Sequence, residues 1–151
     1  MDVSSISNSI MAATALIGTT IALQTFRHQA RTRQFEALIP IRERIEDLTK
    51  GMDFIALLQE DDADLAKIPF ETRANILGWL EVASTALTSG SISEELAFNF
   101  FGFYAIAIRR STNFRHDLPE SSVYWMEFHS FTKRMERVEQ RKAKSHLKPS
   151  T

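Results

Sequence analysis

The chain contains no cysteine, and this absence removes several kinds of chemistry at once. Without a thiol there is no disulfide framework, no cysteine nucleophile and no cysteine-ligated zinc or iron–sulfur site. The net charge of the 151 residues is only −1, so the molecule as a whole lacks the basic excess that is typical of nucleic-acid-binding proteins. There is also no glycine-rich phosphate loop, nucleophile elbow or His-Glu-x-x-His motif. We therefore expect no enzyme, no cofactor, no bound metal, no small-molecule substrate and no nucleic-acid partner.

Formal charge is also missing from residues 3–26, VSSISNSIMAATALIGTTIALQTF, and Arg27, Arg31 and Arg33 follow directly. A helix of this length covers roughly 36 Å at about 1.5 Å per residue, enough to cross a hydrocarbon core of about 30 Å. The run predicts a single N-terminal transmembrane helix over residues 1–26. Because the basic residues follow the run, the positive-inside rule predicts an inner (cytoplasmic) membrane protein with its N-terminus outside and its C-terminal domain in the cytoplasm.

Two alternatives to a membrane span remain open. The run is rich in serine and threonine and contains Asn8, so it could instead be a buried helix or the core of an oligomer. A cleaved signal peptide is the other alternative, but Met1 and Asp2 supply no basic segment before the apolar run. Serine and threonine can bond to their own helix backbone in lipid, which keeps the membrane span as the leading interpretation.

Small residues recur every four positions within the run, at Thr14, Gly18 and Ala22. Residues at this spacing share one helix face, and small side chains there let two helix backbones approach closely. This stripe predicts a helix–helix interface within a homo-oligomer or with other membrane-complex subunits. The alternative is that small residues are simply common in this run.

The rest of the chain predicts an all-α fold with a cytoplasmic bundle of about four helices. We expect a basic juxtamembrane helix over residues 27–50, a helical bundle over 51–140 and a basic tail over 141–151. Pro40 should kink or end the first of these helices, because proline lacks a backbone donor and its ring clashes with the preceding turn.

Three later segments have helical signals. Residues 70–89 carry an apolar stripe, and Gly90 is a plausible end for that helix. Residues 96–108 are apolar on nearly every side and too short to span a bilayer, which predicts a buried central helix with Phe100 and Phe103 in the core. Gly102 inside it suggests close approach of a neighbouring helix. The last helix presents a stripe of Tyr124, Phe128, Phe131, Met135 and Val138.

Glu81 is the single residue that stands out, because it lies between Leu80 and Val82 in an apolar helix. A buried carboxylate needs a partner, and Arg109 or Arg110 at the end of the next long helix is the obvious candidate. We interpret this set as a structural ion pair rather than a catalytic group. The acidic residues between 60 and 64 lack the spacing of a calcium loop and are interpreted as a solvated turn.

The C-terminal segment from Lys133 to Thr151 carries seven basic residues against two acidic ones. Such a segment either contacts anionic membrane lipid or is a solvated helix end. Nucleic acid is a weaker interpretation, because no aromatic residue is interleaved after Phe131.

The stretch ILGWLEVASTALTSGSISEELAFNFFGFYAIAI, behind an apolar run and a basic helix, resembles the DUF4760 group of small bacterial membrane-anchored proteins. The shared pattern is an apolar helix with an internal glutamate (Glu81), a glycine turn (Gly90), a paired-acid helix start (Glu94, Glu95) and an aromatic-rich helix. The resemblance covers residues 27–138. It implies a bacterial or phage-encoded membrane protein and carries over no activity and no catalytic residue.

These observations together predict a non-enzymatic, membrane-anchored interaction or scaffold protein, such as an accessory subunit of a larger membrane complex. The alternative is a phage or defence-linked effector that oligomerises in the bilayer.

Overall fold

The computed structural model describes residues 22, 24–26, 29, 32–119 and 125–146. The chain divides into two compact units, residues 1–36 and 37–151. In the first unit the described residues are helical, and Ala22 is exposed. Most of the predicted membrane span, including Thr14 and Gly18, lies outside the described residues. Among the residues that are described, no helix combines the length and the apolar character needed to cross a bilayer.

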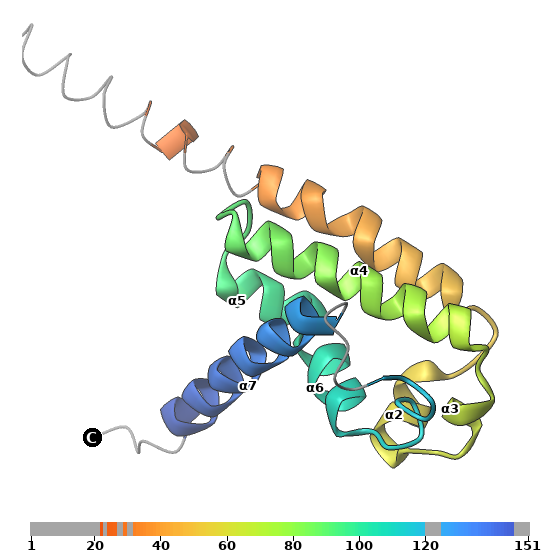
Figure 1. The fold of residues 1–151 in the computed structure, drawn as a ribbon. Coiled ribbons are helices and arrows are strands. Elements are labelled where there is room, and N and C mark those ends of the chain that lie inside the picture. Colours follow the sequence, from red (N-terminus) through yellow and green to blue (C-terminus); the bar gives the residue numbers. More distant parts are fainter. Residues whose placement is uncertain (1–21, 23, 27–28, 30–31, 120–124, 147–151) are drawn as a thin grey trace, which may run out of the picture. The chain divides into compact units, whose positions relative to one another are not determined.

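The second unit is all-α, as predicted, and its described residues contain no strand, but they form more helices than the four that were expected. It begins with helical residues 37–48 (Figure 1). There follow α2 (Phe54–Glu60), α3 (Asp64–Lys67), α4 (Phe70–Thr88), α5 (Glu94–Ala97), the π-helix η1 (Phe98–Gly102), α6 (Phe103–Arg110) and α7 (Met126–His146). The elements α5, η1 and α6 follow one another without a break, and α7 packs on α4, α6 and η1.

The boundary between the two units differs from the expected division at residue 50. Residues 37–48 belong to the bundle unit because Leu38, Ile41 and Ile45 are buried in its core. Pro40 does not end a helix, since the described residues on both sides of it are helical. Proline has a φ that suits a helix, and burial of the neighbouring apolar side chains offsets the lost hydrogen bond. At the other end, α7 continues through residues 141–146 of the expected tail.

The predicted helix over residues 70–89 is confirmed as α4, and its expected stripe of Ile76, Leu80, Ala83 and Leu87 is buried. The helix stops because Gly90 adopts a φ of 75°, which a side chain would disfavour. The backbone N–H of Ser91 then donates to the Ala86 carbonyl at 2.9 Å, the six-to-one bond that closes many helix ends.

The aromatic helix differs from the prediction in which ring it buries. Phe101 is fully buried, whereas Phe100 is only half-buried and Phe103 is 41% exposed. The hydrogen bonds of a π-helix link residues i and i+5 instead of i and i+4, so η1 shifts which side chains face the core. Sequence periodicity at 3.6 residues per turn cannot anticipate that shift.

Gly102 does lie against a close neighbour, but the neighbour belongs to its own helix. A Cβ atom at Gly102 would lie 2.6 Å from a ring carbon of Phe98. The Phe98 ring also contacts α7, because the ammonium nitrogen of Lys142 lies 4.8 Å from its centroid. Gly102 therefore makes room for an aromatic ring that η1 places there.

The last helix confirms most of its expected stripe. Phe128, Phe131, Met135 and Val138 are all buried, while Tyr124 lies outside the described residues.

Two helical glycines provide a matched test of the π-helix packing. Gly78 in α4 would meet nothing within 4 Å of an added Cβ, so Gly78→Ala should raise the free energy of unfolding by up to about 1 kcal/mol through helix propensity alone. Gly102→Ala should instead lower it by about 1–3 kcal/mol, because the Phe98 ring must move. Chemical denaturation of the two variants measures both values. Equal stabilisation by the two substitutions would show that the Phe98 ring can move aside without lowering the free energy of unfolding.

Candidate functional site

The loop that connects α6 to α7 is held in place by a buried arginine. Arg73 lies on the core side of α4 and is only 3% exposed. Its guanidinium donates to the carbonyl oxygen of Ile68 at 3.0 Å, to that of Phe114 at 2.7 Å and to that of His116. Burying this charge is costly unless its donors are satisfied, and three carbonyl oxygens do that here. Arg73 thus ties the start of α4 to the loop at residues 111–118.

A second attachment of the same loop comes from Asp61 at the end of α2. Asp61 adopts a left-handed φ of 48°. Its carboxylate accepts hydrogen bonds from the Ser111 hydroxyl, from the Thr112 hydroxyl at 2.8 Å and backbone N–H at 3.2 Å, and from the Asn113 backbone N–H at 3.2 Å. Burial alone would raise the pKa of Asp61, but these donors outweigh it and lower that pKa below its ordinary value.

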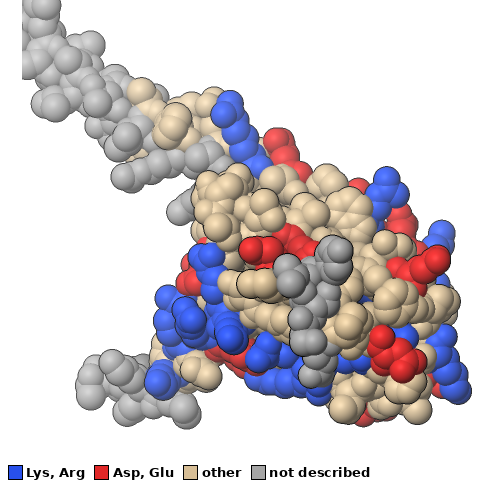
Figure 2. Space-filling model, in the orientation of Figure 1, with Lys and Arg blue, Asp and Glu red and all other residues tan. Residues whose placement is uncertain are grey.

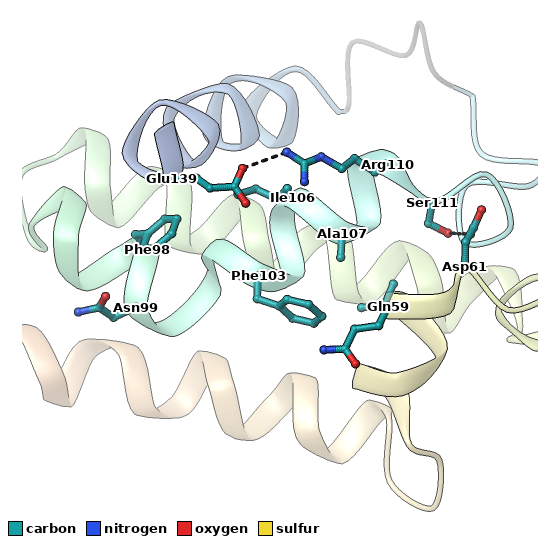
Figure 3. Close-up of a pocket in the computed structure, with 11 residues that line it drawn as sticks. Gln59, Asp61, Phe98, Asn99, Phe103, Ile106, Ala107, Arg110, Ser111 and Glu139 are labelled. Carbon is teal, nitrogen blue, oxygen red and sulfur yellow. Dashed lines mark hydrogen bonds and ion pairs between the residues drawn. The ribbon is translucent and has the colours of Figure 1, made fainter. Parts of the chain in front are cut away.

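With the loop fixed, an open cleft of about 710 Å³ remains between the end of α2 and the consecutive elements η1 and α6, with α7 at its margin (Figure 3). Its apolar lining consists of Leu58, Phe98, Phe103, Ile106 and Ala107. In Figure 3 the Phe103 ring and the Gln59 side chain point toward one another across the opening. The exposure of Phe103 is thus concentrated in a concave surface.

The charged groups at the rim of this cleft are engaged with one another or with the backbone. Arg110 on α6 pairs with Glu139 on α7 at 3.0 Å. Asp61 is occupied by the loop, as described above. The cleft therefore offers an apolar floor with a rim that is close to neutral, and it lacks a cluster of charged groups aimed at one reacting atom.

The predicted pair between Glu81 and the two arginines is not formed. Arg110 pairs with Glu139, and Arg109 lies 3.8 Å from Glu136, so both arginines at the end of α6 reach carboxylates on α7. Glu81 faces the first turn of α7 instead, where it accepts a hydrogen bond from the backbone of Phe128. The sequence could not reveal this, because α7 rather than α6 covers that face of α4.

The environment of Glu81 favours its neutral form. Burial raises the pKa of this carboxyl group, the negative charge of Glu127 adds to that effect, and the Phe128 hydrogen bond opposes it. One of its two oxygens has no hydrogen-bond partner in the structure. Glu127 is thus a second carboxyl group near Glu81, and its carboxylate accepts a hydrogen bond from the Ser84 hydroxyl at 3.4 Å.

The acidic segment at residues 60–64 is a turn that is bound internally. Asp62 accepts a hydrogen bond from the Asp64 backbone N–H at 2.8 Å, and Asp64 pairs with Lys67 at 2.6 Å. Within the described part of the chain, no three His, Cys, Asp or Glu side chains gather as metal ligands would.

Sequence reasoning missed both residues that hold the loop. Arg73 could have been noticed, because it precedes Ile76 and Leu80 at helical spacing and so is a charge on the apolar face of α4. Asp61 gave no such signal, since its role depends on residues about fifty positions away.

No protein-family model matches this chain, and neither does any curated protein or solved structure. The resemblance to the DUF4760 group stays a prediction, and any functional inference rests on the residues themselves.

The pKa shift of Asp61 makes a testable statement about stability. Because the folded-state pKa lies below the unfolded value of about 3.9, the stabilisation is present above that pH and is lost as the pH falls through the folded pKa. Asp61→Asn should cost about 1–3 kcal/mol at neutral pH, and the difference from the unmodified protein should shrink toward about pH 2. The neighbouring exposed Glu60→Gln should change the free energy of unfolding by less than about 0.5 kcal/mol. An Asp61→Asn deficit that is constant from neutral to acid pH would contradict this assignment.

Proposed function

We propose that the protein is a membrane-anchored, non-enzymatic interaction protein whose cleft between α2, η1 and α6 receives an apolar side chain of a partner subunit in a membrane complex. The observation that carries the proposal is the arrangement of the cleft, with an exposed aromatic ring over an apolar floor and a rim of engaged charges. Protein interfaces have this anatomy, with an apolar centre rich in aromatic residues inside a polar margin.

A volume of about 710 Å³ would also suit a small molecule. Small-molecule sites, however, use a few polar groups that converge on the ligand to fix its orientation. In this cleft Arg110 and Glu139 form an ion pair with each other, and the carboxylate of Asp61 accepts hydrogen bonds from the loop. These charged groups therefore have few hydrogen-bonding positions left for a polar ligand. An apolar side chain needs no such partner, which favours a protein occupant.

The membrane anchor in this proposal is the uncharged run at residues 3–26, followed by Arg27, Arg31 and Arg33. The positive-inside rule places the bundle unit on the cytoplasmic side. A partner subunit in the same membrane would then meet the cleft at high effective concentration, because both proteins are confined to one surface. Under that condition, weak contacts across a small cleft are sufficient to hold the partner subunit.

Site-specific photo-cross-linking tests the proposal in the full chain. A benzoyl-phenylalanine at Phe103 should give one discrete adduct with a protein partner in native membranes, and that adduct should stay in the pellet after alkaline washing. The matched control is Phe70, which is also an exposed phenylalanine at 49% but does not line the cleft. Phe103 and Phe70 should therefore differ in yield by about tenfold or more, in line with a specific contact.

Equal yields at the two positions, or no adduct at either, would remove the cleft as a docking site. Recovery of the protein in the alkaline supernatant would instead remove the membrane anchor, so the two parts of the proposal fail separately.

A further inference from the structure

The face of α7 that points away from the core carries positive charge and no carboxylate. Exposed residues follow one another along this face at steps of four and three, and they are Met126, Ser130, Lys133, Arg137, Gln140 and Lys144. We call these six residues the outer stripe. The buried Met135 lies on the opposite side of the helix. Figure 2 shows Lys and Arg side chains gathered over α7 on the face in view.

The three carboxylates of α7 lie off the outer stripe and contact other helices of the bundle unit. Glu136 lies 3.8 Å from Arg109 at the end of α6. Glu139 lies 3.0 Å from Arg110 on the same helix. Glu127, in the first turn of α7, accepts a hydrogen bond from α4 at 3.4 Å. The acidic side chains of α7 are thus directed toward its neighbours in the bundle unit.

The cations of the outer stripe are not paired in this way. Across the described residues, no hydrogen bond or ion pair joins the side chain of Lys133, Arg137 or Lys144 to another group. The neighbouring Arg141 differs, because it pairs with Glu94 of α5. Like charges four residues apart destabilise a helix slightly, and Lys133 and Arg137 form such a pair. An anionic surface would therefore stabilise these three exposed charges.

We propose that the outer stripe of α7 rests on the anionic lipid surface of the membrane that holds the protein, an inference that rests on the proposed membrane anchor. Each basic residue near such a surface favours the contact by about fivefold, so three favour it by about a hundredfold. That preference is too weak to recruit a free protein, but it is sufficient to orient a domain that an anchor already holds at the surface. Met126, which is 62% exposed at one end of the stripe, supplies an apolar side chain for the same interface.

Nucleic acid is the other extended polyanion that a row of cations can contact. Proteins that bind single strands combine such cations with aromatic side chains on which the bases stack. The outer stripe contains no aromatic residue, and the net charge of the whole chain is −1. The stripe therefore suits a lipid surface better than a nucleic acid.

Spin labelling of the full chain in lipid nanodiscs tests the contact, and the absence of cysteine makes an introduced cysteine the only labelled site. Gln140→Cys places the label on the outer stripe, and Gln59→Cys places it at an exposed position of α2. The label at 140 should collide with an uncharged, water-soluble nickel chelate at least about threefold less often in discs of phosphatidylcholine and phosphatidylserine in equal parts than in discs of phosphatidylcholine alone. The label at 59 should collide equally often in both discs.

Charge removal then shows whether the outer stripe makes the contact. Lys133→Gln combined with Arg137→Gln should return the label at 140 to most of its collision rate in phosphatidylcholine alone, because two cations account for about 25-fold of the preference. The matched control is Lys50→Gln combined with Lys67→Gln, which removes two exposed lysines elsewhere in the bundle unit. This control should leave the protection of the label unchanged.

Each contrary result has its own meaning. Equal collision rates for the label at 140 in the two discs, with the chain incorporated in both, would overturn the contact and leave the anchor standing. Equal losses of protection in the two double variants would also overturn it, since diffuse charge would then attract the bundle unit. Protection by an added oligonucleotide, and not by phosphatidylserine, would assign the stripe to nucleic acid instead. A chain that fails to enter either disc would remove the membrane anchor, and the inference with it.

Discussion

The arrangement of the bundle unit depends on one buried guanidinium. Arg73 is placed in the core by α4, and its donors are used by three backbone carbonyls that no helix or sheet satisfies. A buried charge of this kind is tolerated only when its partners are complete, so the loop at residues 111–118 cannot leave without exposing an unpaired cation to the core. Because the buried guanidinium needs these three carbonyls as partners, it fixes the position of the loop.

The cleft that we assign to binding lies beside that loop. Ser111 lines the apolar cleft, and its hydroxyl is held in position by the hydrogen bond that it donates to the Asp61 carboxylate. Arg115 also belongs to this loop, and its Nε donates a hydrogen bond to the Ser111 carbonyl at 2.9 Å. A segment without helical hydrogen bonds thus gains the rigidity that binding sites need from two side chains on other elements.

Prediction from the sequence succeeded where structure depends on local periodicity. The stripe on α4, the glycine that ends it and most of the stripe on α7 follow from residues within one helix, and each was correctly expected. It failed where contacts between residues far apart in the sequence decide which side chains are buried and which are paired. The π-helix changed which aromatic ring is buried, and α7 took the arginine partners that had been assigned to Glu81. The cleft was not foreseen, because it combines residues from elements that the sequence does not place side by side.

Hydrogen exchange in Arg73→Lys tests this account most directly, because a lysine keeps the charge but loses the planar fork that serves several carbonyls. The account predicts that the backbone amides of Phe114 and Leu118, which bond within the loop at 2.8 Å and 2.9 Å, will exchange at least about tenfold faster. Arg42→Lys, which alters an exposed arginine paired with Glu46, should leave those two amides unchanged. Unaltered protection of Phe114 and Leu118 in Arg73→Lys would contradict the claim that this guanidinium holds the loop.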